Sequence, residues 1–188
     1  MNLKGLETRT TVSFDPDGKR DVFVLQGREQ SGDSRSRVAA QLDLLRKKAG
    51  LPWKARVESE GNFPAGAGIA SSAAGFAALT VAAAAALQLD LTVRGLSALA
   101  RRGSGSACRS IPNGFVEWYA ADRDEDSFAE SIAPPDHWRL VFLGLTAIVF
   151  VPPFAKLVSK GGLWIARFWL RGLDNGANTI ALTGVISF

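Results

Sequence analysis

The chain has 188 residues, of which 47% are hydrophobic, and its 22 basic and 18 acidic side chains leave a net charge of +4. This length and composition suit one globular domain and argue against a disordered or fibrous chain. Residues 1–138 hold 17 basic and 17 acidic side chains, so the excess positive charge lies entirely in residues 139–188. Because the body is balanced, we expect no nucleic-acid partner.

The cysteine content and the N-terminus indicate the compartment. Cys108 is the only cysteine of the sequence, so no internal disulfide can form, which suits a reducing compartment. Met1 leads into the polar stretch 2–9, with no apolar segment behind it that would serve as a secretory signal. These features predict a cytoplasmic protein.

The first predicted element is a β-hairpin. Two short runs rich in Val, Thr and Phe, residues 8–14 and 21–25, have the composition of strands. Between them, Asp15-Pro16-Asp17-Gly18 has the residues that a turn requires. We therefore expect the two strands to pair with each other.

A helix and a strand follow the hairpin. Apolar residues at spacings of three and four predict a helix that begins at Ser34 or Ser36 and ends before Gly50. Small or apolar residues alternate with charged ones at positions 55–59, which predicts a half-buried strand. This strand leads directly into the loop 60–67.

Two more helices and a strand complete the body. The alanine-rich stretch 71–89 contains no helix breaker after its first turn, and its wide apolar surface predicts a helix buried on most sides. Thr92 can cap a further helix that runs to Arg102. The small residues 103–106 interrupt it, and the apolar and aromatic run 115–119 predicts another strand.

The composition changes near residue 139. Residues 122–126 form an acidic, solvated loop, whereas residues 140–155 carry no charge. This apolar run is interrupted by two prolines and is shorter than the ~20 residues that span a bilayer. A buried segment and a membrane-seeking segment both fit it, and residues 160–171 could equally form an aromatic, cationic interfacial helix. We expect a domain over residues 1–138 and a divergent hydrophobic, basic tail over residues 139–188.

A loop of small residues joins the predicted strand to the alanine-rich helix. It reads Asn62-Phe63-Pro64-Ala65-Gly66-Ala67-Gly68-Ile69-Ala70-Ser71-Ser72-Ala73-Ala74-Gly75. Small residues let backbone amides approach an anion, the following helix points its positive end at it, and Ser71 and Ser72 add hydroxyls for phosphate or a phosphate-bound metal. The loop has neither the Walker A nor the dinucleotide-binding pattern. A tight turn in which Ala and Gly serve only packing remains an alternative.

A second loop combines serine and arginine. It reads Arg101-Arg102-Gly103-Ser104-Gly105-Ser106-Ala107-Cys108-Arg109-Ser110, and its hydroxyls and guanidinium groups suit an anionic ligand. A capped helix end on a wet surface is the alternative. Cys108 is expected to be a small buried residue rather than a nucleophile, because His137, the only histidine, is distant in sequence. His137 has only Asp136 beside it as a further ligand, so we expect no metal site there.

The two loops, in this order and spacing and followed by Gly114-Phe115-Val116-Glu117-Trp118, closely resemble those of diphosphomevalonate decarboxylases. The resemblance runs from about Leu3 to Trp138. It implies membership of the GHMP small-molecule kinase superfamily, which includes galactokinase, homoserine kinase and mevalonate kinase. It also implies an α+β fold, a two-layer sandwich like domain 2 of ribosomal protein S5.

The resemblance further implies an activity. In that family ATP phosphorylates the tertiary hydroxyl of mevalonate diphosphate, and loss of phosphate with carbon dioxide gives isopentenyl diphosphate for isoprenoid and sterol synthesis. ATP and Mg²⁺ are the implied cofactors, mevalonate diphosphate is the implied small-molecule partner, and a homodimer is the implied assembly.

The resemblance also assigns residues to the site. The implied ATP-binding residues are Pro64, Gly66, Gly68, Ala70, Ser71, Ser72 and Ala73. Ser104, Gly105 and Ser106 would contact the substrate. Arg109 would hold its carboxylate, because a planar guanidinium does so without giving up a proton. Arg109 and Ser72 are therefore the expected catalytic residues.

The sequence departs from the family pattern at both ends. Family members carry a Lys-Tyr-Trp-Gly-Lys motif and a first strand before the region that matches Met1, and a catalytic aspartate far downstream in an Asp-Ala-Gly-Pro-Asn setting. Asp174 lies in a similar setting, Asp174-Asn175-Gly176-Ala177-Asn178, but too early in the chain, and we take this as chance. Two interpretations stay open: an enzyme of isoprenoid synthesis, whole or partial, or an inactive fragment that only binds nucleotide or associates with membrane through its tail.

Overall fold

The structure is a computed structural model that describes residues 6–63 and 70–137, which lie within one compact unit, Met1–His137. In chain order the elements are β1 (Thr8–Asp15), β2 (Val22–Leu25), β3 (Arg28–Glu29), α1 (Gly32–Ala49), β4 (Lys54–Gly61), α2 (Ser71–Ala86), α3 (Val93–Gly103), the short 3₁₀ helix η1 (Gly105–Ser110), β5 (Phe115–Tyr119) and β6 (Phe128–Ala133). The architecture is α+β, as the family resemblance implies. The predicted tail over residues 139–188 lies outside the described residues.

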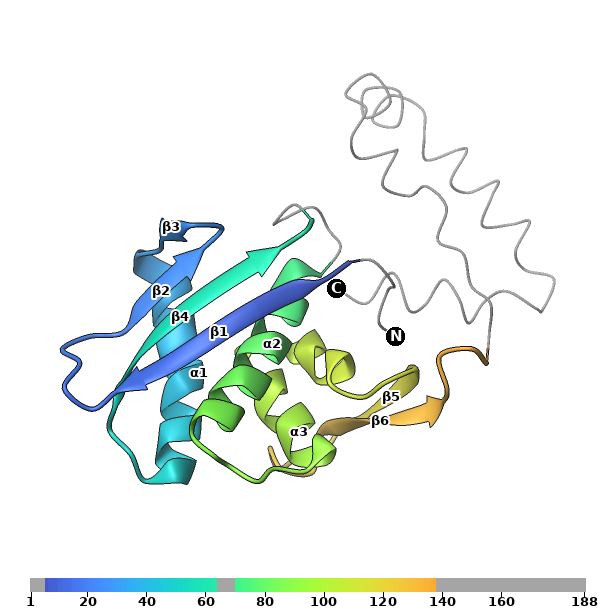
Figure 1. Cartoon of the computed structure of the whole chain (residues 1–188). Coiled ribbons are helices and arrows are strands. Elements are labelled where there is room, and N and C mark those ends of the chain that lie inside the picture. Colours follow the sequence, from blue (N-terminus) through green and yellow to red (C-terminus); the bar gives the residue numbers. More distant parts are fainter. Residues whose placement is uncertain (1–5, 64–69, 138–188) are drawn as a thin grey trace, which may run out of the picture. The chain divides into compact units, whose positions relative to one another are not determined.

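The main sheet has four strands in the order β1-β4-β2-β3, with β4 antiparallel to β1 and parallel to β2 (Figure 1). The predicted hairpin is therefore wrong: both strands form, but β4 lies between them. The turn itself does form, since the amide of Asp17 donates to Asp15 Oδ1 at 3.0 Å. The connection then continues to Val22, long enough to pass the end of one strand, and strands lie about 4.8 Å apart in a sheet. Turn residues predict that the chain reverses direction, but they do not predict which strand will pair with β1.

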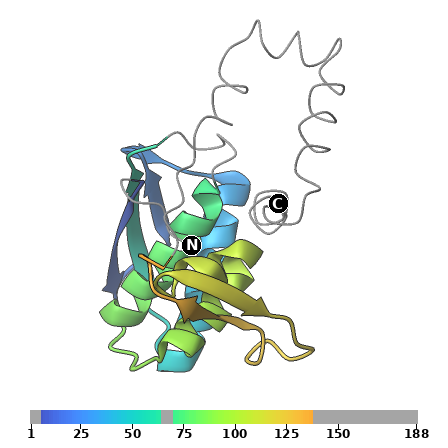
Figure 2. The same cartoon turned by 90° about the vertical axis from the view of Figure 1, so that its right-hand side faces the viewer.

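The three α-helices lie on one face of this sheet, which Figure 2 shows almost edge-on. The strand β4 has the alternating pattern that this arrangement requires: Ala55 and Val57 are buried on the helix side. Arg56 and Glu58 point the other way and form an exposed ion pair of 2.7 Å. The predicted half-buried strand over 55–59 is thus confirmed, with one or two more residues at each end.

The helices form close to where the sequence places them. Gly50 ends α1 in the left-handed conformation, with φ of 68°, which glycine adopts without steric cost. The alanine-rich helix α2 ends at Ala86, three residues earlier than predicted. Its alanines allow close approach to β1 and α3, and Ala77 and Ala83 are almost fully buried. Thr92 caps α3 as predicted, accepting a hydrogen bond from the amide of Gly95 at 3.1 Å.

Buried polar groups fix the helices relative to one another. The Gln41 amide of α1 donates to Thr80 Oγ1 in α2 at 2.9 Å and to the Leu99 carbonyl in α3 at 3.0 Å. Both Gln41 and Thr80 are at most 1% exposed. Because unpaired buried polar groups are costly, these bonds favour one arrangement of the three helices.

A two-stranded antiparallel sheet of β5 and β6 extends from the helical layer (Figure 1). The strand β5 covers the predicted run 115–119, whereas β6 was not predicted. Gly114 precedes β5 with a φ of 76°, and a side chain there would overlap the carbonyl oxygen of Ala133.

Among the residues that the structure describes, no helix is long and apolar enough to cross a membrane.

Candidate functional site

The small-residue loop leaves the sheet at a fixed point. Asn62 directly follows β4; its amide donates to the Glu7 carbonyl at 3.1 Å, and its side-chain oxygen accepts from the Glu7 amide at 2.9 Å. These two bonds continue the pairing of β1 with β4 beyond the last ladder residue. Pro64, Gly66 and Gly68, which were expected to contact nucleotide, lie outside the described residues.

The loop returns at Ala70, which adopts the left-handed conformation with φ of 57° and ψ of 40°. This conformation is unfavourable for a residue with a Cβ and costs roughly 1–2 kcal/mol. Ala70 has no side-chain oxygen to cap α2, and its carbonyl accepts from the amides of Ala73 and Ala74. The first turn of α2 carries no acidic residue. The N-terminus of α2, where the helix dipole is positive, therefore has no side-chain cap. Its backbone amides are suited to binding an anion.

The serine and arginine loop forms the end of α3 and the 3₁₀ helix η1. Ser97 of α3 is fully buried; its hydroxyl donates to the Cys108 carbonyl at 2.9 Å and accepts from the Ala129 amide at 2.8 Å. A single hydroxyl thus ties η1 to both α3 and β6. Gly105 is exposed, while Ser104, Ser106 and Arg109 are half-buried.

The fold brings the two loops together. η1 packs against α2, and the hydroxyl oxygens of Ser72 and Ser104 lie 3.5 Å apart although 32 residues separate them. This distance is long for a hydrogen bond, but it places the start of α2 beside the start of η1. We call residues 70–73 and 104–109 the two-loop site. Of the predicted residues, Ala70, Ser71, Ser72 and Ala73 lie on one side of it, and Ser104, Gly105, Ser106 and Arg109 on the other.

The three arginines of the second loop have different surroundings. Arg101 and Arg102 both pair with the carboxylate of Asp124, from the loop between β5 and β6. The guanidinium of Arg109 forms no hydrogen bond or ion pair with residues 6–63 or 70–137. Among the described residues, Arg109 thus differs from Arg101 and Arg102 in having no carboxylate partner.

Sequence reasoning missed the residues that support the second loop. Arg37 of α1 donates to the Gly103 carbonyl at 3.0 Å, and its guanidinium lies 5.0 Å from the centre of the Phe76 ring. A side chain at position 103 would overlap that ring, so the glycine permits this approach. The acidic loop 122–126 is exposed, as predicted, but it also forms ion pairs with α3. Opposite charges at 94–102 and 122–126 were a signal for this contact.

Cys108 is confirmed as a buried residue. It is 0% exposed, and its thiol donates to the Gly105 carbonyl at 3.1 Å. Burial raises the pKa of this thiol, and the nearby charge of Arg109 only partly opposes the shift. His137 is exposed, and the described part of the chain contains no group of three or more His, Cys, Asp or Glu side chains arranged to hold a metal.

Comparison with known proteins identifies the family. Residues 1–129 match the family described as the diphosphomevalonate decarboxylase-like N-terminal domain. The chain belongs to this family. The match confirms the resemblance inferred from the two loops.

The chain matches only part of the length of its relatives in this family. The phosphomevalonate decarboxylase of Haloferax volcanii is 43% identical over 125 residues, which are 66% of this chain and 39% of the relative. A solved structure of the mevalonate diphosphate decarboxylase from Enterococcus faecalis is 49% identical with a TM-score of 0.64, covering 68% of this chain and 41% of that one. A structure described as MDDEF in complex with MVAPP, AMPPCP and magnesium has the same identity and TM-score and covers 68% and 40% of the two chains. The chain thus spans about two fifths of these relatives.

Proposed function

We propose that the chain provides the nucleotide loop and the substrate loop of an ATP-dependent decarboxylase that converts mevalonate diphosphate to isopentenyl diphosphate. The observation that carries this proposal is the approach of Ser72 and Ser104, whose hydroxyl oxygens lie 3.5 Å apart. Phosphoryl transfer depends on holding donor and acceptor next to each other, and this contact joins the two loops suited to them.

The start of α2 is suited to the phosphates of ATP. Ala70 leaves the helix end without a side-chain cap, and Ser72 is exposed beside it. We assign nucleotide phosphates to this end, with Ser71, Ser72 and Ala73 in the first turn and Pro64, Gly66 and Gly68 in the preceding loop. Mg²⁺ fits here as a nucleotide-bound ion, because it keeps several waters and uses phosphate oxygens, with the Ser72 hydroxyl as a protein contact. Bound there, Mg²⁺ neutralises phosphate charge.

The start of η1 is suited to the organic substrate. Ser104, Gly105 and Ser106 offer hydroxyl and backbone groups to its diphosphate and hydroxyl oxygens, and Arg109 offers a guanidinium that has no partner among the described residues. A carboxylate held by two parallel hydrogen bonds from Arg109 is kept in place while the tertiary carbon, which a CH₂ group separates from the carboxyl carbon, loses the phosphate from its oxygen and becomes electron-poor. The carboxyl carbon can then leave as carbon dioxide, and its bonding electrons form the new double bond.

We also propose the finer features that this function implies. The α+β body is a two-layer sandwich of the ribosomal protein S5 domain 2 type, bounded near residue 138. The wider protein is a cytoplasmic enzyme of isoprenoid and sterol synthesis and a homodimer. The four-stranded sheet with helices on one face supports the sandwich assignment.

Two alternatives have support of their own. The Haloferax volcanii relative is named phosphomevalonate decarboxylase, so a monophosphate is a second candidate substrate. A chain that binds nucleotide without turnover is the other, because the described acidic residues include no counterpart of the family's catalytic aspartate.

Binding measurements on the purified 188-residue chain test the proposal. By isothermal titration calorimetry we expect binding of Mg–AMPPCP and of mevalonate diphosphate, the latter tighter than mevalonate monophosphate. Ser72→Ala should weaken the nucleotide and Ser104→Ala the mevalonate ligand, whereas Ser131→Ala, an exposed serine on β6, should change neither. Tighter binding of the monophosphate would transfer the assignment to that substrate. Failure to bind either mevalonate ligand would remove the decarboxylase assignment from this chain, and carbon dioxide release with ATP and Mg²⁺ would exclude the nucleotide-only alternative.

A further inference from the structure

The loop between β5 and β6 reaches back to the end of α3. One carboxylate oxygen of Asp124 accepts from Nη2 of Arg101, and the other lies 2.8 Å from Nη1 of Arg102. Both oxygens of one side chain are therefore used by two consecutive residues of the last helical turn. The Arg101 side chain is only 21% exposed, so this pair is partly shielded from water.

The same loop is attached a second time, near the start of α3. Asp126 lies 3.5 Å from Arg94, whose guanidinium stacks 3.8 Å from the centre of the Phe128 ring. Arg123 holds Asp126 from within the loop at 2.6 Å. The loop thus runs along α3 from its first turn to its last and is attached to both ends of it.

The attachment at Asp124 directly precedes the two-loop site. Gly103 ends α3, and the amide of Ser104 still donates to the Ala100 carbonyl at 3.3 Å. Only Gly103 separates Arg102 from Ser104, whose hydroxyl lies beside that of Ser72. The direction in which the last turn of α3 points therefore decides where the hydroxyl of Ser104 and the start of η1 lie.

We propose that Asp124 is a positioning residue of the two-loop site. By holding Arg101 and Arg102 together, it fixes the junction between α3 and η1, and with it Ser104, Ser106 and Arg109. It also keeps two of the three guanidinium groups of this loop paired within the protein. The part of this inference that concerns the bound molecule rests on the proposed function, and the part that concerns the protein alone does not.

Asp124→Asn is the direct test, because asparagine keeps the shape of the side chain and removes its charge. Asp122→Asn is the matched control: Asp122 is exposed in the same loop and forms no hydrogen bond or ion pair with the described residues. Asp124→Glu keeps the charge and should restore the wild-type behaviour. Since the Asp124 side chain is 50% exposed, its ion pairs contribute only modestly to the free energy of folding, so we expect all three variants to fold, with melting temperatures within a few degrees of the wild type.

Two measurements on the 188-residue chain decide the inference. Hydrogen exchange without ligand should be faster over residues 103–110 in Asp124→Asn and unchanged in Asp122→Asn. In calorimetry, Asp124→Asn should raise the Kd of mevalonate diphosphate on the order of tenfold and leave the Kd of Mg–AMPPCP within about twofold. A general loss of stability would raise the Kd of both ligands. A higher Kd for mevalonate diphosphate alone would therefore show that Asp124 positions the substrate loop.

The outcomes separate this inference from the proposed function. If the wild-type chain binds neither ligand, the proposed function fails, and the exchange of residues 103–110 alone decides whether Asp124 fixes the junction. Unchanged exchange in Asp124→Asn would overturn the positioning role. Tighter binding of both ligands by Asp124→Asn would also overturn it, since the aspartate would then merely withhold two positive charges.

Discussion

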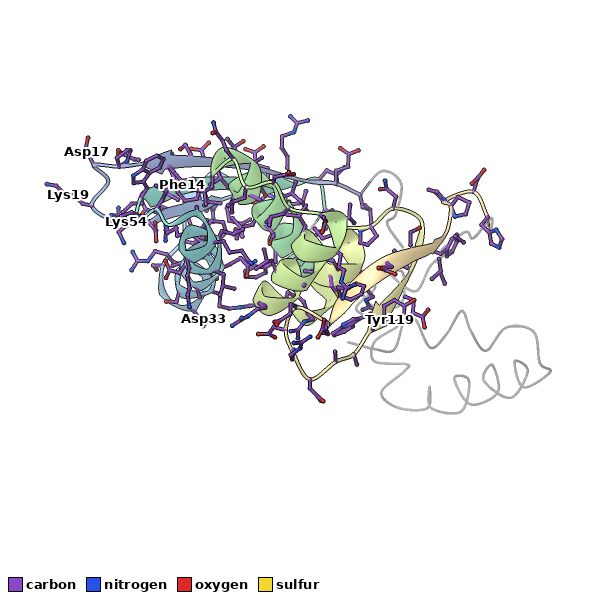
Figure 3. All side chains as sticks on the ribbon, turned by 90° about the horizontal axis from the view of Figure 1, so that it is seen from below. Phe14, Asp17, Lys19, Asp33, Lys54 and Tyr119 are labelled. Carbon is purple, nitrogen blue, oxygen red and sulfur yellow. The ribbon has the colours of Figure 1, made fainter. Side chains whose placement is uncertain are left out.

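Two arginines at different places in the fold have opposite surroundings. Arg46, near the end of α1, is 7% exposed and donates to both carboxylate oxygens of Asp21 and to Asp43. Its guanidinium also lies 5.7 Å from the centre of the Phe14 ring. Figure 3 labels Phe14 and Lys54 at this end of the described unit and Tyr119 at the other. Arg109, in η1, is half-buried and has no such partner among the described residues.

The difference separates an arginine that the fold pairs with carboxylates from one that has no partner of this kind among the described residues. Burial lowers the pKa of Arg46, but the hydrogen bonds and charges of Asp21 and Asp43 outweigh this effect, and its pKa is raised overall. Asp21 Oδ1 also accepts from the Ala55 amide at 2.8 Å, so the pair joins α1 to β4. A guanidinium without a partner of this kind contributes little to stability and can bind an external anion.

The largest effect that we predict is loss of stability on breaking the Arg46 pair. Arg46→Met should lower the free energy of unfolding by about 3 kcal/mol, because it leaves the Asp21 carboxylate largely buried and uncompensated. Urea unfolding followed by circular dichroism measures this loss. Arg20→Met is the matched control, because Arg20 pairs with Glu29 on the exposed surface. The unfolding midpoint of this variant should stay at that of the wild type. Equal losses in the two variants would refute the structural role of Arg46.

The next effect concerns two glycines near the two-loop site. Gly103→Ala should lower the free energy of unfolding by about 2 kcal/mol, because the new methyl group would overlap the Phe76 ring. Gly75→Ala, within α2, should instead raise it by about 0.5–1 kcal/mol, since nothing lies within 4 Å of the added carbon and alanine is the better helix former. The opposite signs are readily separated in one unfolding series. A stable Gly103→Ala protein would mean that α3 and α2 are not in close contact there.

Replacing Arg109 should leave the fold unchanged and affect binding alone. Arg109→Lys keeps the positive charge but loses the paired hydrogen bonds to a carboxylate, so we expect the Kd of mevalonate diphosphate to rise on the order of tenfold. The unfolding midpoint should not move, in contrast to Arg46→Met. Unchanged affinity together with a lowered midpoint would give Arg109 a structural role and remove the contrast between the two arginines.

The smallest effect is the pH dependence that Cys108 contributes. Its pKa is raised in the folded protein by burial, so the unfolded chain loses the thiol proton first as pH rises. The stability that the protonated Cys108 thiol contributes is therefore fully present below the ordinary thiol pKa of about 8.5, and it declines as the pH rises above that value. The decline in stability between pH 8 and 10 should therefore be shallower in Cys108→Ala than in the wild type. A thiol reagent such as dithionitrobenzoate should react with the wild type in urea but only slowly in buffer, and rapid reaction in buffer would contradict the burial.

The sequence predicts the local elements well because their signals are local. Helix ends at Gly50 and Thr92 form where the sequence places them, and the strands over 8–14 and 21–25 both exist. Their pairing could not be predicted, since the strand that separates them, β4, arrives only after α1. A turn signal carries no information about a strand some thirty residues further along the chain.

Part of the candidate site could likewise be predicted from the sequence, and part could not. The residue types of both loops indicated anion binding, and the approach of Ser72 and Ser104 agrees with their belonging together. The pairing of Asp124 with Arg101 and Arg102 was not predicted, because an acidic loop on the surface is usually solvated and only the return of the β5–β6 hairpin brings it to α3. The left-handed conformation of Ala70 was equally invisible, since alanine rarely adopts it.

The position of β4 between β1 and β2 also bears on synthesis at the ribosome. Within the described part of the chain, β1 pairs only with β4, so it gains this backbone partner only after residues 54–61 have been translated. Until then the polar and apolar faces of β1 are both open to other chains in the cell, and non-local pairing of this kind is slow to form. During translation we therefore expect chaperones to bind β1 more than α2 and α3, which follow its partner β4 in the chain.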